Sequence, residues 1–434
     1  MGSGKSCVNI TPNLHRNPHG MPDIFMKIVI NNKPANQFPI TEILTGLWLS
    51  LSVISVNAEN IHRNDYEQSL IQSLDDLSQQ RINPAFDRIE QLVEDNPNFR
   101  LAQLIYADLL LAKAQPLTEF GAHPGAKTKA PEEKLQGLRD EARKRWQHYS
   151  NPKQTGTMPA SMIHLDKKTN HAVLVDLENS RLYIFKNNNG SPELVEDYYV
   201  SIGKRGADKL VQGDKKTPIG VYAITSFIPD KKLPEFYGSG AFPIDYPNRW
   251  DRRLGKTGYG IWLHGTPVDT YSRPPLASDG CVAISNDEFT QLRPYIKIRK
   301  TPVVITRGIN WIPRDEWLQR QERFSELLDS WEKDWESKDS KAYLAHYSEK
   351  DFKSGNYNYS RWAAHKSRVN AAKKYIRVKR SAVNVFAYPG VENMLEVTFE
   401  QHYQSNNYNN SSHKRQYWKK ESDGRWRIIY EGPA

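Results

Sequence analysis

The spacing of apolar residues in the first part of the chain predicts helices. In residues 82–93 and again in residues 101–109, apolar side chains recur three or four positions apart, as on one face of a helix. Asn96-Pro97-Asn98 separates the two runs, and proline ends a helix far more readily than it continues one. Residues 61–115 are therefore expected to form mainly helices, with a sharp turn at this tripeptide.

This helix–turn–helix is similar to a single tetratricopeptide-type pair. One such pair cannot bury both of its faces. We expect it to dock on the rest of the chain or on a second copy, which would make a homodimer through the N-terminal helices. Residues 116–160 are rich in Pro, Gly, Lys and Thr and are expected to be a linker with one charged helix at about 131–148.

From residue 161 the pattern changes to short apolar runs separated by turns. The predicted strands are residues 172–176, 181–185, 198–202, 221–224, 261–263 and 301–306. Gly213, Thr217-Pro218 and Gly220 supply turn residues between them. Many short strands with turn signals indicate a mainly β domain at 161–308.

Residues 309–434 begin with a helix and end with strands. Phe324, Leu328, Trp331 and Trp335 fall on one helical stripe. The strands expected after it are residues 383–386, 394–403, 415–419 and 425–430. Asp423-Gly424 predicts a hairpin between the last two. Helices followed by an antiparallel sheet indicate a separate α+β domain, at about 320–432.

The charge of the chain narrows the choice of partner. The 434 residues carry a formal net charge of +10, which favours polyanionic surroundings such as an acidic cell-wall polymer. Lys and Arg are spread along the chain, and no nucleic-acid-binding motif is present, so we do not expect a nucleic-acid partner.

An apolar run at residues 43–56 predicts export. The run is shorter than the ~20 apolar residues that a membrane helix needs, and Val56 and Ala58 suit the −3 and −1 positions of a signal cleavage site. We expect residues 1–58 to hold a signal peptide with an upstream extension, cleaved after Ala58, which makes the mature protein periplasmic. An uncleaved anchor and a buried helix are the alternatives. Met26 could be the native start, in which case residues 1–25 are not native.

Two cysteines are present, and Cys7 lies in the segment expected to be removed. The remaining thiol, Cys281, would be a liability in an oxidising compartment unless it is used. Upstream, His264-Gly265 follows an apolar strand. An imidazole can take a thiol proton and return it to a leaving amine, with the Gly265 carbonyl as acceptor for its other nitrogen. We assign Cys281 as nucleophile and His264 as base; the alternative is that both are packed residues without chemistry.

The joint pattern resembles the L,D-transpeptidase (YkuD-like) catalytic domain. The motif is His264-Gly265, a spacer and Ser278-Asp279-Gly280-Cys281-Val282, and Gly213 to Gly220 is similar to the family's Gly-x-x-x-Thr-Pro-x-Gly turn. The resemblance covers about residues 168–307. It implies a β sandwich and an attack on the carbonyl between the diamino acid and the terminal D-alanine of a tetrapeptide stem, giving a thioester. Water as acceptor gives L,D-carboxypeptidase activity, and an amine gives a 3–3 crosslink or protein attachment.

Two positions depart from that family's pattern. Asp279 stands where many members carry His, which leaves His264 as the one base candidate, and Ala283 stands where many carry Arg or Asn. Gly280 lets the backbone pass close to a substrate, and the amides of Gly280 and Cys281 could face the developing oxyanion.

Further residues are candidates for substrate binding. Arg273 in the spacer could pair with a stem carboxylate, or it could be a solvated surface residue. Asp279 could bind a substrate amine, or it could be a turn residue beside Gly280. Ser278 and Tyr259 flank the motif and complete this set. We expect neither a cofactor nor a metal.

Residues 322–431 resemble a nuclear-transport-factor-2-like domain. The likeness rests on the aromatic positions Trp331, Trp335, Tyr343 and Tyr347 and on the later strands. It implies a cone with a pocket, whose chemistry the fold does not fix. We see no catalytic set in this domain, so we expect it to bind a glycan or a protein partner.

The whole chain is predicted to be multidomain: an α-helical region at 59–150, a mainly-β L,D-transpeptidase sandwich at 161–308 and an α+β cone at 320–432. Together these parts resemble the cell-shape L,D-carboxypeptidases of curved Gram-negative bacteria. We therefore favour removal of D-alanine from tetrapeptide stems, giving tripeptides, over transpeptidation. A noncatalytic wall-binding scaffold is a rival of another class, whereas the lack of Cys-x-x-Cys argues against a thiol–disulfide redox protein.

Overall fold

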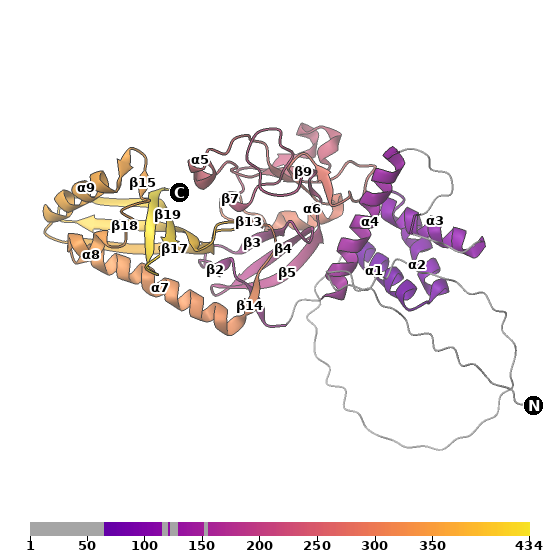
Figure 1. Ribbon diagram of the computed structural model, residues 1–434, viewed down its shortest axis with the longest axis horizontal. Helices are drawn as coiled ribbons and strands as arrows, with labels where there is room; N and C mark the ends of the chain where they lie inside the picture. The colour runs from indigo at the N-terminus through magenta and orange to yellow at the C-terminus, as the bar shows by residue number, and fades with distance from the viewer. Residues whose placement is uncertain (1–64, 115–119, 122–128, 152–154) are drawn as a thin grey trace, which may run out of the picture.

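The computed structural model describes residues 65–114, 120–121, 129–151 and 155–434. Figure 1 shows three units in a row: N-terminal helices, a central β-rich unit and a C-terminal α+β unit. This arrangement confirms the predicted fold class. The export segment, its cleavage site at Ala58, Cys7 and residues 1–25 lie outside the described residues. Within the described ranges, no helix is both long enough and apolar enough to cross a bilayer.

Four helices make up the N-terminal unit. They are α1 Asp65–Ser78, α2 Ile82–Asp95, α3 Arg100–Ala114 and α4 Lys129–Ser150. The predicted pair is α2 and α3, and the apolar stripe of α2 is buried as expected, including Phe86 and Ile89. The pair packs against α1 and α4 and also against Tyr271 of the central unit. The pair therefore docks on this chain, and the homodimer stays a prediction.

The larger sheet of the central unit has five strands in the order β5-β4-β3-β13-β7. Their bounds are β3 His171–Asp176, β4 Arg181–Asn188, β5 Ser191–Tyr199, β7 Gly220–Ala223 and β13 Pro302–Thr306. Neighbours are antiparallel except β3 and β13, which run parallel. Strands β3, β4, β7 and β13 match predicted strands closely.

A second sheet of the central unit faces the first and carries the site. Its order is β12-β10-β9-β8. Its strands are β8 Ile228–Pro229, β9 Gly240–Pro243, β10 Trp262–His264 and β12 Val282–Ala283. A separate short pair is formed by β6 Ile202–Gly203 and β11 Leu276–Ser278. The helices of the central unit are α5 Arg249–Arg253 and α6 Asn286–Leu292. Val173 and Ile184 of the larger sheet share one core with Phe242 and Leu263 of this one and with Phe289 of α6. The two sheets therefore form a sandwich around a single apolar layer.

The C-terminal unit is a curved five-stranded sheet, in the order β2-β17-β18-β19-β20, with helices against it (Figure 1). The strands of this sheet are β2 Met162–His164, β17 Ile376–Ala387, β18 Met394–Ser405, β19 Asn409–Lys420 and β20 Trp426–Pro433. The helices are α7 Arg314–Glu336, α8 Ser340–Leu344 and α9 Tyr359–Ala371. Two short strand pairs lie outside the sheet: β1 Thr157–Pro159 pairs with β14 Trp311–Pro313, and β15 Lys353–Ser354 pairs with β16 Tyr357–Asn358. Strand β2 precedes both sheets of the central unit in sequence yet belongs to this sheet, because it pairs with β17.

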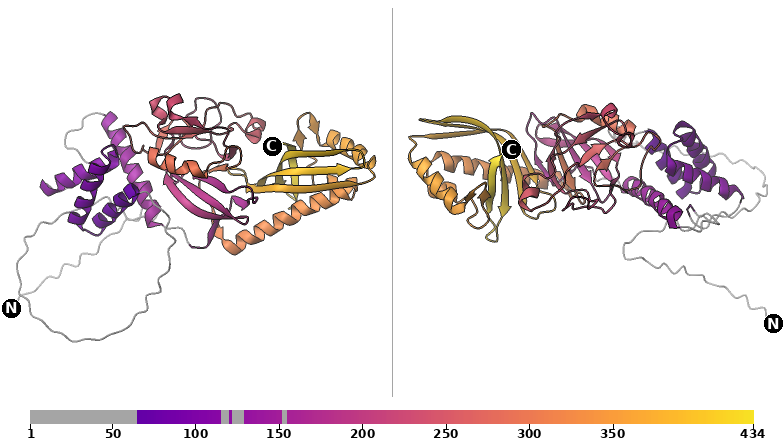
Figure 2. Two further views of the ribbon diagram at one scale, coloured as in Figure 1. Left: turned by 180° about the vertical axis from the view of Figure 1, so that it is seen from behind. Right: turned by 90° about the horizontal axis from the view of Figure 1, so that it is seen from above.

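The central and C-terminal units share a third apolar cluster. Outward-facing residues of the larger central sheet, such as Leu174, pack with Tyr417 and Ile429 of the C-terminal sheet. The Asn248 side-chain amide donates to the Tyr388 hydroxyl at 2.9 Å across this contact. Both views in Figure 2 show the C-terminal unit at the end of the molecule remote from the helices.

Candidate active site

Strands β10 and β12 bring the predicted nucleophile and base together. The two strands are parallel neighbours, with Leu263 opposite Val282 and His264 opposite Ala283. Cys281 is the residue directly before β12, two positions from Ala283, so its side chain leaves the strand on the same face as His264. The thiol is partly exposed and donates to the Gly260 carbonyl at 3.4 Å, whereas His264 is buried.

The tautomer of His264 is set by its own backbone neighbour. Its Nδ1 lies 2.6 Å from the Gly265 carbonyl oxygen. A carbonyl can only accept, so Nδ1 carries the proton and Nε2 has a free lone pair. Burial lowers the pKa of His264 to about 4, and the bond to Gly265 offsets only part of that effect. The imidazole is therefore neutral at pH 7 and can accept a proton at Nε2.

The Cys281 thiol is also neutral at rest. Burial raises the pKa of Cys281 to about 11, and the nearby Asp279 charge adds to this, although the backbone of Trp262 acts in the opposite direction. Both members of the predicted pair are therefore neutral at pH 7.

The turn that presents Cys281 is organised by Ser278. The buried Ser278 hydroxyl donates to the Cys281 carbonyl at 2.6 Å and accepts from the Gly280 amide at 3.1 Å. Gly280 has φ +125°, and a Cβ there would lie 2.8 Å from the Lys216 carbonyl oxygen. The Gly280 amide is thus used inside the turn, whereas the Cys281 amide makes no hydrogen bond with any described residue.

The other predicted site residues lie around this pair. The Arg273 guanidinium carbon lies 4.9 Å from the Phe236 ring centroid, Nη2 donates to the Ala277 carbonyl, and Nη1 is buried with no acceptor in the part of the chain that the structure describes. Asp279 is exposed and pairs with Lys204 at 3.3 Å. Tyr259 is 76% exposed, so its side chain lies at the protein surface and is not part of a closed pocket.

Two kinds of contact at the site have no signal in the sequence pattern. The Tyr237 ring centroid lies 5.0 Å from that of His264 and 4.9 Å from that of Trp262, which forms an aromatic wall beside the imidazole. Asn286 joins two site loops, because its Oδ1 accepts from the Ser239 amide at 2.9 Å and its Nδ2 donates to the Thr266 carbonyl at 2.8 Å.

Two family profiles match the chain. Residues 170–305 match the L,D-transpeptidase catalytic domain, and residues 323–432 match the Cds6 C-terminal NTF2-like domain. The solved structure of Bd1075 from Bdellovibrio bacteriovorus is 31% identical, with a TM-score of 0.57, over 64% of this chain and 97% of that one. The chain belongs to the L,D-transpeptidase family. It is an L,D-transpeptidase-type enzyme that modifies peptidoglycan.

A second relative supports the same assignment. Pgp2 from Campylobacter jejuni, described as a helical cell shape determining protein, is 26% identical, with a TM-score of 0.53, over 63% of this chain and 95% of that one. The predicted resemblance to cell-shape L,D-carboxypeptidases is confirmed at this level. A search of curated protein sequences finds no match. Helices α1–α4 lie outside both profiles, of which the first begins at residue 170.

Proposed function

We propose that this L,D-transpeptidase-family enzyme removes the terminal D-alanine from tetrapeptide stems, with Cys281 as nucleophile and His264 as base. The observation that carries the proposal is the bond from His264 Nδ1 to the Gly265 carbonyl, at 2.6 Å. It leaves Nε2 as a proton acceptor on the face that Cys281 shares.

The first half-reaction forms a thioester. Cys281 Sγ attacks the carbonyl carbon between the diamino acid and D-alanine while its proton moves to His264 Nε2. The Cys281 amide, which has no partner among the described residues, can donate to the oxyanion. When the tetrahedral intermediate collapses, the C–N bond breaks, and the imidazolium gives its proton to the amine of the departing D-alanine.

The second half-reaction consumes the thioester. Water attacks the acyl carbon, His264 takes a proton from it, and the C–S bond breaks to give the tripeptide carboxylate and the free thiol. A stem amine in place of water would give a crosslink. We favour water because the chain resembles the cell-shape L,D-carboxypeptidases, and the likeness to Pgp2, a helical cell shape determining protein, supports this choice.

The substrate places the enzyme outside the cytoplasmic membrane, and we propose the periplasm, reached by cleavage after Ala58. We assign the C-terminal unit a binding role toward glycan or a protein partner. There the indole N–H groups of Trp335 and Trp362 are buried without an acceptor among the described residues, and the Lys366 ammonium lies 4.4 and 4.5 Å from their ring centroids. Buried donors without partners are costly, which favours a ligand that satisfies them.

The deciding experiment incubates the protein with purified tetrapeptide muropeptides and analyses the products by mass spectrometry. Loss of one alanine is expected from the wild type and not from Cys281→Ala or His264→Gln. Glu94→Gln, which changes an exposed carboxylate of helix α2, is the control and should retain release. If crosslinked dimers form instead of tripeptides, the acceptor of the acyl group is an amine and not water. If the substrate stays unchanged with both the wild type and Cys281→Ala, the proposed enzymatic function is refuted and the noncatalytic wall-binding scaffold is favoured.

A further inference from the structure

The loop between β10 and β11 carries Arg273, and the N-terminal helices hold much of it. The Tyr271 amide donates to the Asn98 carbonyl at 3.1 Å, and the Asn98 side-chain amide donates to the Val268 carbonyl at 3.4 Å. Asn98 belongs to the turn between α2 and α3. The tripeptide that ends a helix in the sequence is therefore also a contact point for a loop of the active site.

The side chain of Tyr271 is part of the N-terminal core. It is 6% exposed, and its ring centroid lies 4.5 Å from that of Phe99 and 5.7 Å from that of Tyr66. Among the described residues it is the one member of that buried cluster that comes from the central unit. A buried aromatic side chain contributes much apolar area, so loop and helices stabilise each other.

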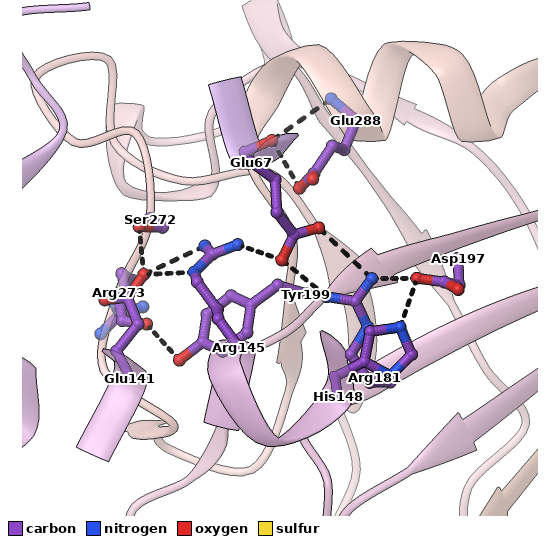
Figure 3. Close-up of polar contacts among 11 residues, drawn as sticks. Glu67, Glu141, Arg145, His148, Arg181, Asp197, Tyr199, Ser272, Arg273 and Glu288 are labelled. Atoms are coloured by element: carbon purple, nitrogen blue, oxygen red, sulfur yellow. Dashed lines mark hydrogen bonds and ion pairs between the residues drawn. The ribbon is translucent and has the colours of Figure 1, made fainter. Parts of the chain in front are cut away.

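Helix α4 holds the next part of the loop. The Ser272 hydroxyl donates to Glu141 Oε1 at 2.6 Å, and Glu141 is fully buried and paired with Arg145 at 3.0 Å (Figure 3). At Gly137 the α4 backbone lies directly on the loop, since a Cβ there would be 2.9 Å from Pro274 Cγ. The helix therefore leaves no room for this segment to move toward it.

A buried ionic cluster fixes the helices to the larger catalytic sheet. Glu67 of α1 pairs with Arg145 of α4 at 2.7 Å and with Arg181 of β4 at 2.8 Å (Figure 3). From the sheet side, the Arg273 carbonyl accepts from the Tyr199 hydroxyl at 3.0 Å, and a second hydroxyl, of Ser201, donates to it at 2.7 Å. The backbone at Arg273 is thus held by the sheet, while helices hold the residues on its N-terminal side.

The Nη1 group of Arg273 is left for a ligand. Nη2 is used by the Ala277 carbonyl, whereas Nη1 is buried without an acceptor in the described ranges. The guanidinium is close enough to the reactive pair to lower the pKa of both His264 and Cys281. Asp279 also acts on it electrostatically, but that carboxylate is exposed and paired with Lys204.

We propose that the N-terminal helices are a positioning element of the active site: by holding residues 268–274 they keep Arg273 Nη1 where it receives the terminal carboxylate of the stem peptide. The proposal rests on the proposed function for its substrate class. A guanidinium N–H to a carboxylate is a charge-assisted hydrogen bond, which is strong only when donor and acceptor are well placed. Tyr271, Ser272 and Glu141 are then positioning residues.

The test measures binding rather than turnover, in the full chain carrying Cys281→Ala. The probes are a tetrapeptide stem with a free terminal carboxylate and the same peptide with a terminal amide, titrated calorimetrically. We expect the acid to bind about 10- to 100-fold more tightly than the amide, as for a hydrogen bond to a charged group. In Arg273→Ala the two peptides should bind equally well. In Tyr271→Leu the preference for the acid should be mostly lost although Arg273 is intact.

Control variants separate positioning from general damage. Ile89→Val trims the same N-terminal core away from the loop and should keep the ratio, and Tyr271→Phe keeps the ring and should keep most of it. Adding Tyr271→Leu to Arg273→Ala should cause no further change in the ratio. If Tyr271→Leu does not fold, Gly137→Ala presses α4 against Pro274 and tests the same contact.

Three results would overturn the proposal. The first is an equal affinity of the Cys281→Ala chain for the acid and the amide peptide. The second is an acid-to-amide affinity ratio that stays unchanged in both Tyr271→Leu and Gly137→Ala. The third is that neither peptide binds. Failure of the proposed function looks different. A wild-type enzyme that releases no D-alanine, beside a chain that still distinguishes acid from amide, would defeat the chemistry and leave the positioning intact.

Discussion

Replacing Glu67 by glutamine should loosen the junction between the helices and the catalytic unit. Glu67 is 5% exposed, and its carboxylate pairs with Arg145 and Arg181, which are also buried. Glutamine keeps the shape but removes the charge. The two guanidinium groups then stay buried with less compensation, which is the costly way to break a buried ion pair.

The size of the effect follows from the titration of the carboxyl group. Burial raises the pKa of Glu67, but the charges of Arg181 and Arg145 outweigh it and lower the pKa from 4.5 to about 2. At roughly 1.4 kcal/mol per pKa unit, this is about 3 kcal/mol. Because the pKa in the folded state lies below that in the unfolded state, the stabilisation is fully present above about pH 4.5 and is lost as the pH falls toward 2.

Hydrogen exchange read by mass spectrometry measures this effect region by region. At pH 7, protection of residues 65–78 and 129–150 should fall by about 100-fold in Glu67→Gln, which corresponds to about 3 kcal/mol. At pH 3 the difference in free energy should shrink by about half, which leaves a gap of about 10-fold in protection factors. Glu94→Gln changes an exposed carboxylate of the same unit and should leave protection unchanged. Equal protection of Glu67→Gln and wild type at pH 7, or a gap of the same size at both pH values, would refute the reasoning.

Three further predictions concern the site. Gly280→Ala places a Cβ 2.8 Å from the Lys216 carbonyl at φ +125°, so kcat/KM for D-alanine release should fall about 10- to 100-fold, with unchanged far-UV circular dichroism. Because burial raises the pKa of Cys281 to about 11, its iodoacetamide alkylation should be slower than that of free cysteine at pH 7 and should rise with pH to about 11; a rate that levels off below pH 8 would contradict this. Asn286→Ala removes two hydrogen bonds between site loops and should lower kcat about 10-fold in the same release assay, whereas unchanged kcat would remove Asn286 from the site.

The sequence predicts the local elements well, because periodicity is a local property. The α2–α3 pair, strands β3, β4, β7 and β13 and the last hairpin appear where the apolar spacing and turn residues place them, whereas the strand predicted at 198–202 is wrong in its bounds, since β5 spans Ser191–Tyr199. Strand β2 could not be predicted as part of the C-terminal sheet. It spans three residues, Met162–His164, and its partner β17 begins only at Ile376. No local pattern encodes a pairing between segments so far apart.

The site divides in the same way. Cys281 and His264 stand in a motif, so their types and order predict them as a nucleophile and a base. The environment of Arg273 depends on burial and on a donor left without an acceptor, and neither can be seen in a sequence. Tyr237 lies next to His264 only because a separate loop folds over β10. The packing of Tyr271 against apolar residues of the N-terminal helices is likewise a contact between segments far apart in the sequence.

The pairing of β2 with β17 makes the catalytic unit an insertion within the C-terminal unit. The chain contributes the edge strand Met162–His164, builds the whole catalytic sandwich, and then returns at α7 to complete the sheet that it began. Two crossings, rather than one flexible tether, thus join the units, and rotation about a single linker is not available to them. The thiol of Cys281 and the aromatic cone are consequently held at one fixed spacing, so any ligand bound in the C-terminal unit would lie at a set distance from the thiol.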